Sequence, residues 1–263
     1  MSKKAIVIIA VAAAAAAAAA YYWSPANREA RFIDELVARN LDARGGEGAW
    51  DGVTTMRMLG HMDLGQDLVV PYVLEQKRPG KMCFEFEFDN ATSTQCTDGQ
   101  KGWKIAPFRG RTEPEPMNDL EYREMAYSSD PYGLLYNYKQ RNLEIDYLGI
   151  EPVDGHDAYK LQINLPGGGK RWLYLGTESA LDIKLEMPRV IAGREFLVET
   201  VYSDWLDVEG LRIPGRQETR TGSDDEWHFL TVESVVVNPT IEDDRFHIPT
   251  AVNADPASGG SGS

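Results

Sequence analysis

The chain has 263 residues and a formal net charge of -14, with 43% hydrophobic and 10% aromatic residues. A chain of this size can bury one sizeable core, and no shift in composition marks a second domain. The acidic balance disfavours nucleic acid and anionic membrane surfaces as partners, because the chain offers no basic stripe to neutralise them.

The N-terminal segment has the pattern of a secretory signal peptide. Lys3 and Lys4 precede the apolar run from Ala5 to Ala20, which ends on small residues. We therefore expect residues 1–20 to be a signal peptide. The alternative is a retained anchor over 1–23, since such a helix would reach roughly 28 Å. Either reading leaves the folded part outside the cytoplasm, and no Cys follows the run to carry a lipid anchor.

The first folded element is predicted to be a helix. Asn27 can cap it, and Gly45-Gly46 supplies its end. The predicted buried face of this helix consists of Ile33, Leu36, Val37 and Leu41. We expect it to close one side of a sheet.

Most of the remaining chain alternates apolar and polar residues, with Gly, Asp or Asn turns between the runs. This period of two predicts antiparallel strands with one apolar face. Pro71 is expected to place its strand at an edge or in a bulge. The expected strands cover 53–64, 67–78, 81–88, 91–97, 101–107, 143–151, 157–165, 170–176, 181–188, 195–206, 211–221 and 226–238.

The two cysteines lie in one predicted hairpin. Asp89-Asn90 suits a two-residue turn, and that register places Cys83 directly opposite Cys96. A disulfide between them is allowed, and it would staple the outer, polar face. A three-residue loop would instead send the two thiols to opposite faces.

The turn after this hairpin begins at Asp98-Gly99 and sets the face of the next strand. If Gly99 forms a bulge in a three-residue loop, Trp103 and Ile105 join the face of Phe84. A two-residue loop would place them on the cysteine face. We favour the bulge, because it buries the indole ring.

A helical insertion is expected between Asn118 and Asn142. Asn118 and Glu121 have capping-box spacing, and Asp130 with Pro131 marks a second helix start. The second piece would present Leu134, Leu135 and Tyr138 on one face. That face either lids a cavity on the concave side of the sheet or completes a dry core.

No catalytic motif is present in the sequence. Gly167 to Lys170 lacks phosphate-loop spacing and is typical of a hairpin turn. Four scattered histidines have no metal-ligand spacing, and acidic pairs occur in turns. We therefore expect no metal, no cofactor and no enzymatic activity. The histidines are His61, His156, His228 and His247.

The distinctive feature of the sequence is a set of methionine and aromatic side chains on the predicted strands. Methionine is flexible and polarisable, so a surface built from it adapts to irregular apolar ligands. The alternative is a fully packed core rich in methionine. The predicted ligand-binding residues are Met56, Met58, Met62, Met82, Phe84, Phe86, Trp103, Leu134, Leu135 and Tyr138.

Three segments resemble signatures of the outer-membrane lipoprotein-sorting (LolA-like) proteins. They are TDGQKGWKIAP at 97–107, YSDWLDVEGLRIP at 202–214 and NPTIEDDRFHIP at 238–249, within a match from about residue 33 to 249. The resemblance implies a mainly β domain over 27–250. It would be a curved antiparallel meander forming an unclosed half-barrel, with helices covering a concave face that shelters acyl chains. Residues 251–263 are expected to be a disordered tail.

These observations predict a periplasmic carrier or binder of a lipophilic ligand, such as lipoprotein acyl chains or lipid, in envelope trafficking. An alternative is a membrane-anchored envelope sensor on the same scaffold. The expected partners are a lipophilic ligand or lipoprotein and an inner- or outer-membrane protein, with no nucleic acid. Protected edge strands favour a monomer.

Overall fold

The computed structural model describes residues 24–66, 68–191, 193–222 and 226–249. The expected signal peptide or anchor and the expected tail at 251–263 lie outside these residues. Among the helices described, none is long and apolar enough to cross a membrane.

Within the described residues, thirteen strands form one antiparallel sheet in the order β6-β5-β4-β3-β2-β1-β15-β14-β11-β10-β9-β8-β7, and β12 pairs with β13. The end strands β6 and β7 do not pair, so the predicted mainly β, unclosed sheet is confirmed. The strands are β1 Thr55–Asp63, β2 Val69–Lys77, β3 Lys81–Phe88, β4 Ala91–Thr97, β5 Gly102–Ala106, β6 Arg111–Pro116, β7 Glu144–Val153, β8 His156–Asn164, β9 Lys170–Gly176, β10 Asp182–Ile191, β11 Arg194–Ser203, β12 Leu206–Val208, β13 Leu211–Ile213, β14 Arg216–Thr221 and β15 His228–Val237.

Three strand predictions need correction. The single strand expected at 211–221 is two strands, because β13 ends at Ile213 and pairs with β12, whereas β14 begins at Arg216 and belongs to the large sheet. β6 was not predicted, because its sequence RTEPEP has no apolar face; as an edge strand it tolerates proline. β2 was expected at an edge or in a bulge, yet it lies between β1 and β3 in regular register. Pro71 is tolerated there because the pairing with β3 begins one residue later, at Tyr72.

The chain divides into two compact units, each built from separate stretches. As far as they are described, unit 1 contains residues 24–47, 135–202 and 221–222, and unit 2 contains 48–134, 203–220 and 226–249. Each is treated by itself below. That they form one domain stays a prediction.

The N-terminal helix belongs to unit 1. α2 spans Pro25–Ala43, and its cap is Ser24 rather than the predicted Asn27, because the Ser24 hydroxyl accepts from the Asn27 N–H and Pro25 fits the first turn. The helix ends where the Gly46 N–H donates to the Leu41 carbonyl at 2.8 Å. The predicted buried face is confirmed: Ile33, Leu36, Val37 and Leu41.

α2 packs on one face of the unit 1 strands. Phe32 meets Tyr147 and Tyr159 edge to face, with ring centroids 4.9 and 5.9 Å apart. Tyr147 is opposite Leu161, which is opposite Leu173, and both leucines are buried. The helix therefore closes this face, as its sequence predicted.

Only the first helix of the predicted insertion forms. α4, in unit 2, spans Asp119–Ser128 and begins with the predicted capping box of Asn118 and Glu121. Residues 131–142 form turns instead of a second helix. Gly133 and Asn137 adopt φ of 80° and 50°, which a right-handed helix cannot accommodate. Leu134, Leu135 and Tyr138 therefore do not share a helical face.

Candidate functional site

The apolar face is one side of the sheet in unit 2. Met58 is opposite Leu74, which is opposite Phe84, so β1, β2 and β3 contribute side chains in register. Because neighbours at paired positions point to the same side, six of the predicted ligand-binding residues come together here. The apolar face consists of Met56, Met58, Met62, Tyr72, Leu74, Met82, Phe84 and Phe86.

Burial decreases along this face. Met56 is fully buried, and Met58 and Tyr72 are 8% and 2% exposed, whereas Phe84 and Phe86 are only half-buried. A row of rings runs from Tyr72 through Phe84 and Phe86 to Phe108, with successive centroids 5.4, 6.4 and 5.9 Å apart. Phe108 is 45% exposed, so the row ends in the open.

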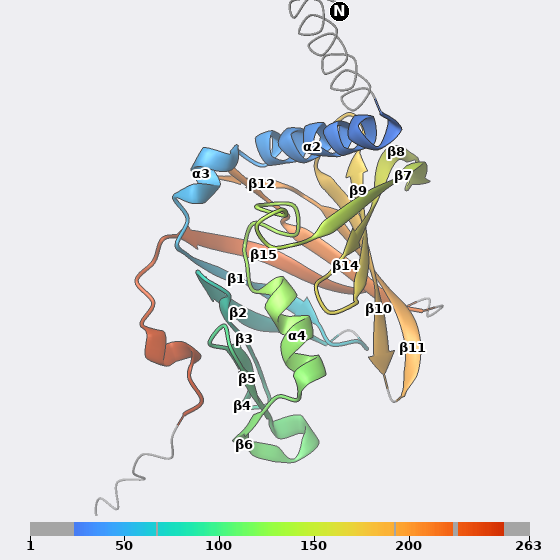
Figure 1. Ribbon diagram of the computed structural model, residues 1–263. Helices are drawn as coiled ribbons and strands as arrows, with labels where there is room; N and C mark the ends of the chain where they lie inside the picture. Colours follow the sequence, from blue (N-terminus) through green and yellow to red (C-terminus); the bar gives the residue numbers. More distant parts are fainter. Residues whose placement is uncertain (1–23, 67, 192, 223–225, 250–263) are drawn as a thin grey trace, which may run out of the picture. The chain divides into compact units, whose positions relative to one another are not determined.

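α4 packs against β4 and β5 of unit 2 (Figure 1). Gln76, which pairs with Met82, donates from Nε2 to the carbonyls of Ser128 and Ser129 at 3.1 Å each. The Lys104 ammonium pairs with the Glu121 carboxylate of α4. The first half of the predicted insertion therefore covers part of the face.

A pocket of about 480 Å³ opens at the end of the aromatic row. Its apolar lining includes Leu64, Leu68, Phe86, Phe88 and Phe108. Its charged lining residues are Lys104, Arg109, Arg111 and Glu121. The lining thus combines apolar side chains with three cationic groups and one carboxylate, and the pocket's size lies in the range of small-molecule sites.

Phe88, Phe108 and Arg109 were missing from the predicted site. Phe88 continues the alternation of Phe84 and Phe86, so strand parity could have found it. Phe108 and Arg109 lie in a 3-10 turn, Pro107–Arg109, where no strand period applies. Their place beside β3 depends on how β5 and β6 pair.

The predicted disulfide between Cys83 and Cys96 is confirmed, with the two residues directly opposite and their Cα atoms 4.1 Å apart. Asp89 and Asn90 adopt positive φ, as the predicted two-residue turn requires. The expected exposed location is wrong. Both cysteines are fully buried, because Ile241 and Phe246 of the C-terminal segment cover them.

Trp103 lies on the cysteine face, so its predicted place beside Phe84 is wrong. It is opposite Cys96, and its indole Nε1–H donates to the Phe246 carbonyl at 2.8 Å. The Asp98 N–H bonds the Lys101 carbonyl, which leaves Gly99 and Gln100 as a two-residue turn instead of a bulge. Ile105 follows the same parity and packs against this cluster.

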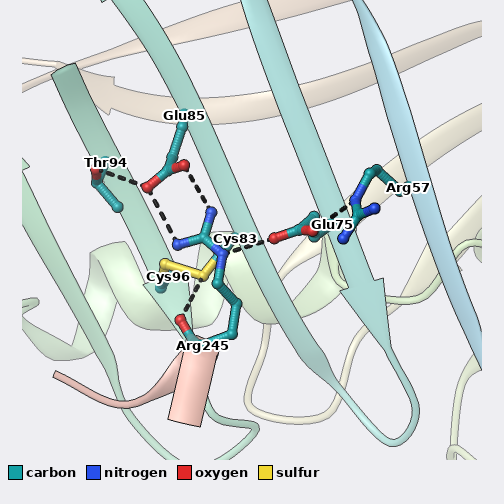
Figure 2. A network of polar contacts seen from close by, with 7 residues as sticks. All are labelled: Arg57, Glu75, Cys83, Glu85, Thr94, Cys96 and Arg245. Carbon is teal, nitrogen blue, oxygen red and sulfur yellow. Dashed lines mark hydrogen bonds and ion pairs between the residues drawn. A yellow bond between two sulfur atoms is a disulfide. The ribbon is translucent and has the colours of Figure 1, made fainter. Parts of the chain in front are cut away.

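An ion-pair network lies beside the disulfide (Figure 2). Arg245 Nε is 2.6 Å from Glu75, its Nη2 is 2.6 Å from Glu85, and Arg57 Nε is 2.7 Å from Glu75. Burial acts to raise the pKa of Glu75, but the hydrogen bonds from Arg245 and Arg57 outweigh it and hold that pKa below its usual value. Arg245 thus ties the C-terminal segment to β2 and β3.

The last three predicted site residues are divided between the two units. Leu134 is half-buried in unit 2. Leu135 and Tyr138 belong to unit 1, where Leu135 is buried and the Tyr138 hydroxyl donates to Asp34 at 2.6 Å. No group of three His, Cys, Asp or Glu among the described residues could hold a metal ion.

The histidines do not gather. His61 pairs with Glu233 at 2.8 Å and His247 with Asp244 at 3.7 Å, both with exposed partners, and His156 and His228 are exposed. They are separate side chains near the surface and form no common site.

No protein-family model and no curated protein matches the chain. Solved structures do. A DUF1329 family protein from Desulfovibrio piger is 12% identical with a TM-score of 0.56, over 83% of this chain and 97% of that one. A LolA superfamily protein from Nitrosomonas europaea is 13% identical with a TM-score of 0.55, over 82% and 97%.

A third similar structure is a domain named for outer membrane lipoprotein sorting, from Vibrio parahaemolyticus. It is 11% identical with a TM-score of 0.50, over 80% of this chain and 97% of that one. At such identities the likeness concerns the fold. The chain therefore has the LolA-like fold that its sequence motifs predicted.

Proposed function

We propose that the protein is a periplasmic carrier or binder of a lipophilic ligand, which lies on the apolar face of unit 2. The observation that carries this proposal is the half-open aromatic row that ends in the pocket of about 480 Å³. Rings that a packed core would bury are here only partly covered.

The energetics favour an apolar ligand. Each methylene moved from water onto such a surface contributes about 0.8 kcal/mol, so a short stretch of acyl chain supplies affinity without a catalytic group. Met62 and Met82 are half-buried beside the rings, and flexible thioether side chains can repack around chains of different shape.

Two further observations support the envelope setting. The chain begins with a signal-peptide pattern, which directs a protein across the inner membrane. Among the proteins that share its fold, one is named for lipoprotein sorting and another for the LolA superfamily. Lipid or lipoprotein trafficking is the role that unites these features. Of the sequence-predicted lid residues, Leu134 lies in unit 2 and is kept as a proposed ligand contact.

The test compares two alanine variants of neighbouring residues on β3. Phe86→Ala removes a ring from the aromatic row, whereas Glu87→Ala removes an exposed side chain on the opposite face. Titration with a fluorescent fatty acid should show about 10-fold or greater loss of affinity for Phe86→Ala, since a buried aromatic side chain is worth roughly 1.5–3 kcal/mol. Glu87→Ala should bind as the wild type does.

Urea unfolding of both variants separates loss of binding from loss of folding. Lipid extracted from protein purified from its own compartment gives an independent readout. A wild-type protein that binds no fatty acid and carries no lipid would refute the proposal, and so would equal affinities in a folded Phe86→Ala and Glu87→Ala.

A further inference from the structure

We propose that the pocket of unit 2 selects anionic amphiphiles: the acidic head group pairs with Arg109, and the acyl chain lies along Phe108, Phe88 and Phe86. The inference rests on the proposed function and names the class of ligand. It concerns only groups within unit 2.

The charges that line the pocket do not cancel. Lys104 is occupied by Glu121, and the Arg111 guanidinium pairs with Glu115 at 2.6 Å. Arg109 also lines the pocket, but it makes no ion pair within the described part of the chain. One positive charge is therefore left for a ligand.

The position of Arg109 suits an amphiphile. It follows Phe108 directly, in the 3-10 turn that the Gly110 N–H closes on the Pro107 carbonyl at 2.9 Å. Phe108 stacks on Phe86 with an interplanar angle of 17° and touches Phe88 at a centroid distance of 5.4 Å. An apolar track thus ends one residue from a guanidinium.

The net charge of the whole chain bears on how an anion would bind. The chain carries a net charge of -14, so an anion is repelled in general and needs a local cation to bind. A guanidinium can hold a carboxylate or phosphate through two parallel hydrogen bonds. A zwitterionic head group offers the same phosphate beside a quaternary ammonium, so it carries no net negative charge for the arginine to attract. Because Arg109 is exposed, the gain is modest and falls with added salt.

The experiment uses two lysolipids with the same acyl chain, lysophosphatidylglycerol and lysophosphatidylcholine, which compete with a fluorescent fatty acid for the full chain. Arg109→Gln removes the charge and Arg109→Lys keeps it. Arg123→Gln is the matched control, because Arg123 is an exposed arginine of α4 that does not line the pocket. We expect the wild type to prefer the anionic lysolipid about fivefold at low salt.

That preference should vanish in Arg109→Gln, persist in Arg123→Gln and be partly kept in Arg109→Lys. Equal binding of both lysolipids by the wild type, or an unchanged preference in Arg109→Gln, would overturn the inference while leaving the proposed function standing. Binding of the fatty acid but of neither lysolipid would overturn the inference alone, whereas a protein that binds none of the three probes and carries no lipid would refute the proposed function and the inference with it. Displacement of the fatty acid by inorganic phosphate alone would show that the site needs no acyl chain, which also overturns the inference.

Discussion

Replacing Arg245 with methionine should destabilise the protein, because this arginine joins two carboxylates on neighbouring strands. Methionine keeps much of the aliphatic stem but removes the charge. The guanidinium contacts Glu75 on β2 at 2.6 Å and Glu85 on β3 at 2.6 and 3.1 Å. Arg57 remains as a second partner of Glu75 at 2.7 Å.

The expected loss follows from burial. The side chain of Glu75 is 7% exposed and that of Arg245 is 27% exposed. The burial of this ion pair is therefore intermediate between that of a fully buried pair and that of a surface pair. Breaking a buried pair costs about 3–5 kcal/mol, whereas a surface pair contributes about 0–1 kcal/mol. With Arg57 still in place, we expect a loss of about 2 kcal/mol in the free energy of unfolding.

The loss should depend on pH with a definite sign. The pKa of folded Glu75 lies below its ordinary value of 4.5, so its contribution to stability is present above about that pH. The contribution is lost as the pH falls through the lowered folded pKa. Without Arg245 that pKa rises, so the difference between wild type and variant should be largest above pH 4.5 and shrink in more acidic solution.

Urea unfolding at neutral and acidic pH measures both effects. Arg111→Met is the matched control, since it breaks an ion pair whose arginine side chain is 52% exposed, and it should cost less than about 1 kcal/mol. Equal losses in the two variants, or a loss in Arg245→Met that does not change between pH 7 and acidic solution, would contradict this reasoning.

Two further changes test other parts of unit 2. Tyr72→Phe removes a buried hydroxyl that has no hydrogen-bond partner in the described structure. We therefore expect urea unfolding to show unchanged or slightly higher stability. A loss above about 1 kcal/mol in the free energy of unfolding would show that the hydroxyl has a partner. The double variant Cys83→Ala/Cys96→Ala removes a cross-link between residues separated by 13 positions. We expect a loss of about 3 kcal/mol in the free energy of unfolding, measured in urea without reducing agent. Equal stability of the double variant and the wild type would disprove this expectation.

Local turn chemistry decides how far the sequence predicts the sheet. Asp89 and Asn90 form a two-residue turn, which fixes the register that brings the cysteines together. The prediction failed at Trp103 because Gly99 suggested a bulge. The Asp98 carboxylate accepts from the N–H groups of Gln100 and Lys101 at 2.9 Å each, and this favours the tight turn that reverses the parity.

Long-range contacts account for the other differences. Cys83 alternates with glutamates, so its side of β3 is expected to face solvent. The C-terminal segment, more than 150 positions away, covers it with Phe246 and bonds Trp103. Neither contact has a periodic signal. The lining of the pocket also lacks a periodic signal, because Phe108 and Arg109 belong to a turn rather than to a strand.

The two faces of the unit 2 sheet differ in a way that connects stability to binding. An exposed apolar patch on a protein surface marks a binding site or favours association. In unit 2 the strands are connected on the opposite face of the sheet: the disulfide joins β3 to β4, and Arg245 joins β2 to β3. Because these bonds stabilise the register from the opposite side, Phe84 and Phe86 can remain partly uncovered and available to a ligand.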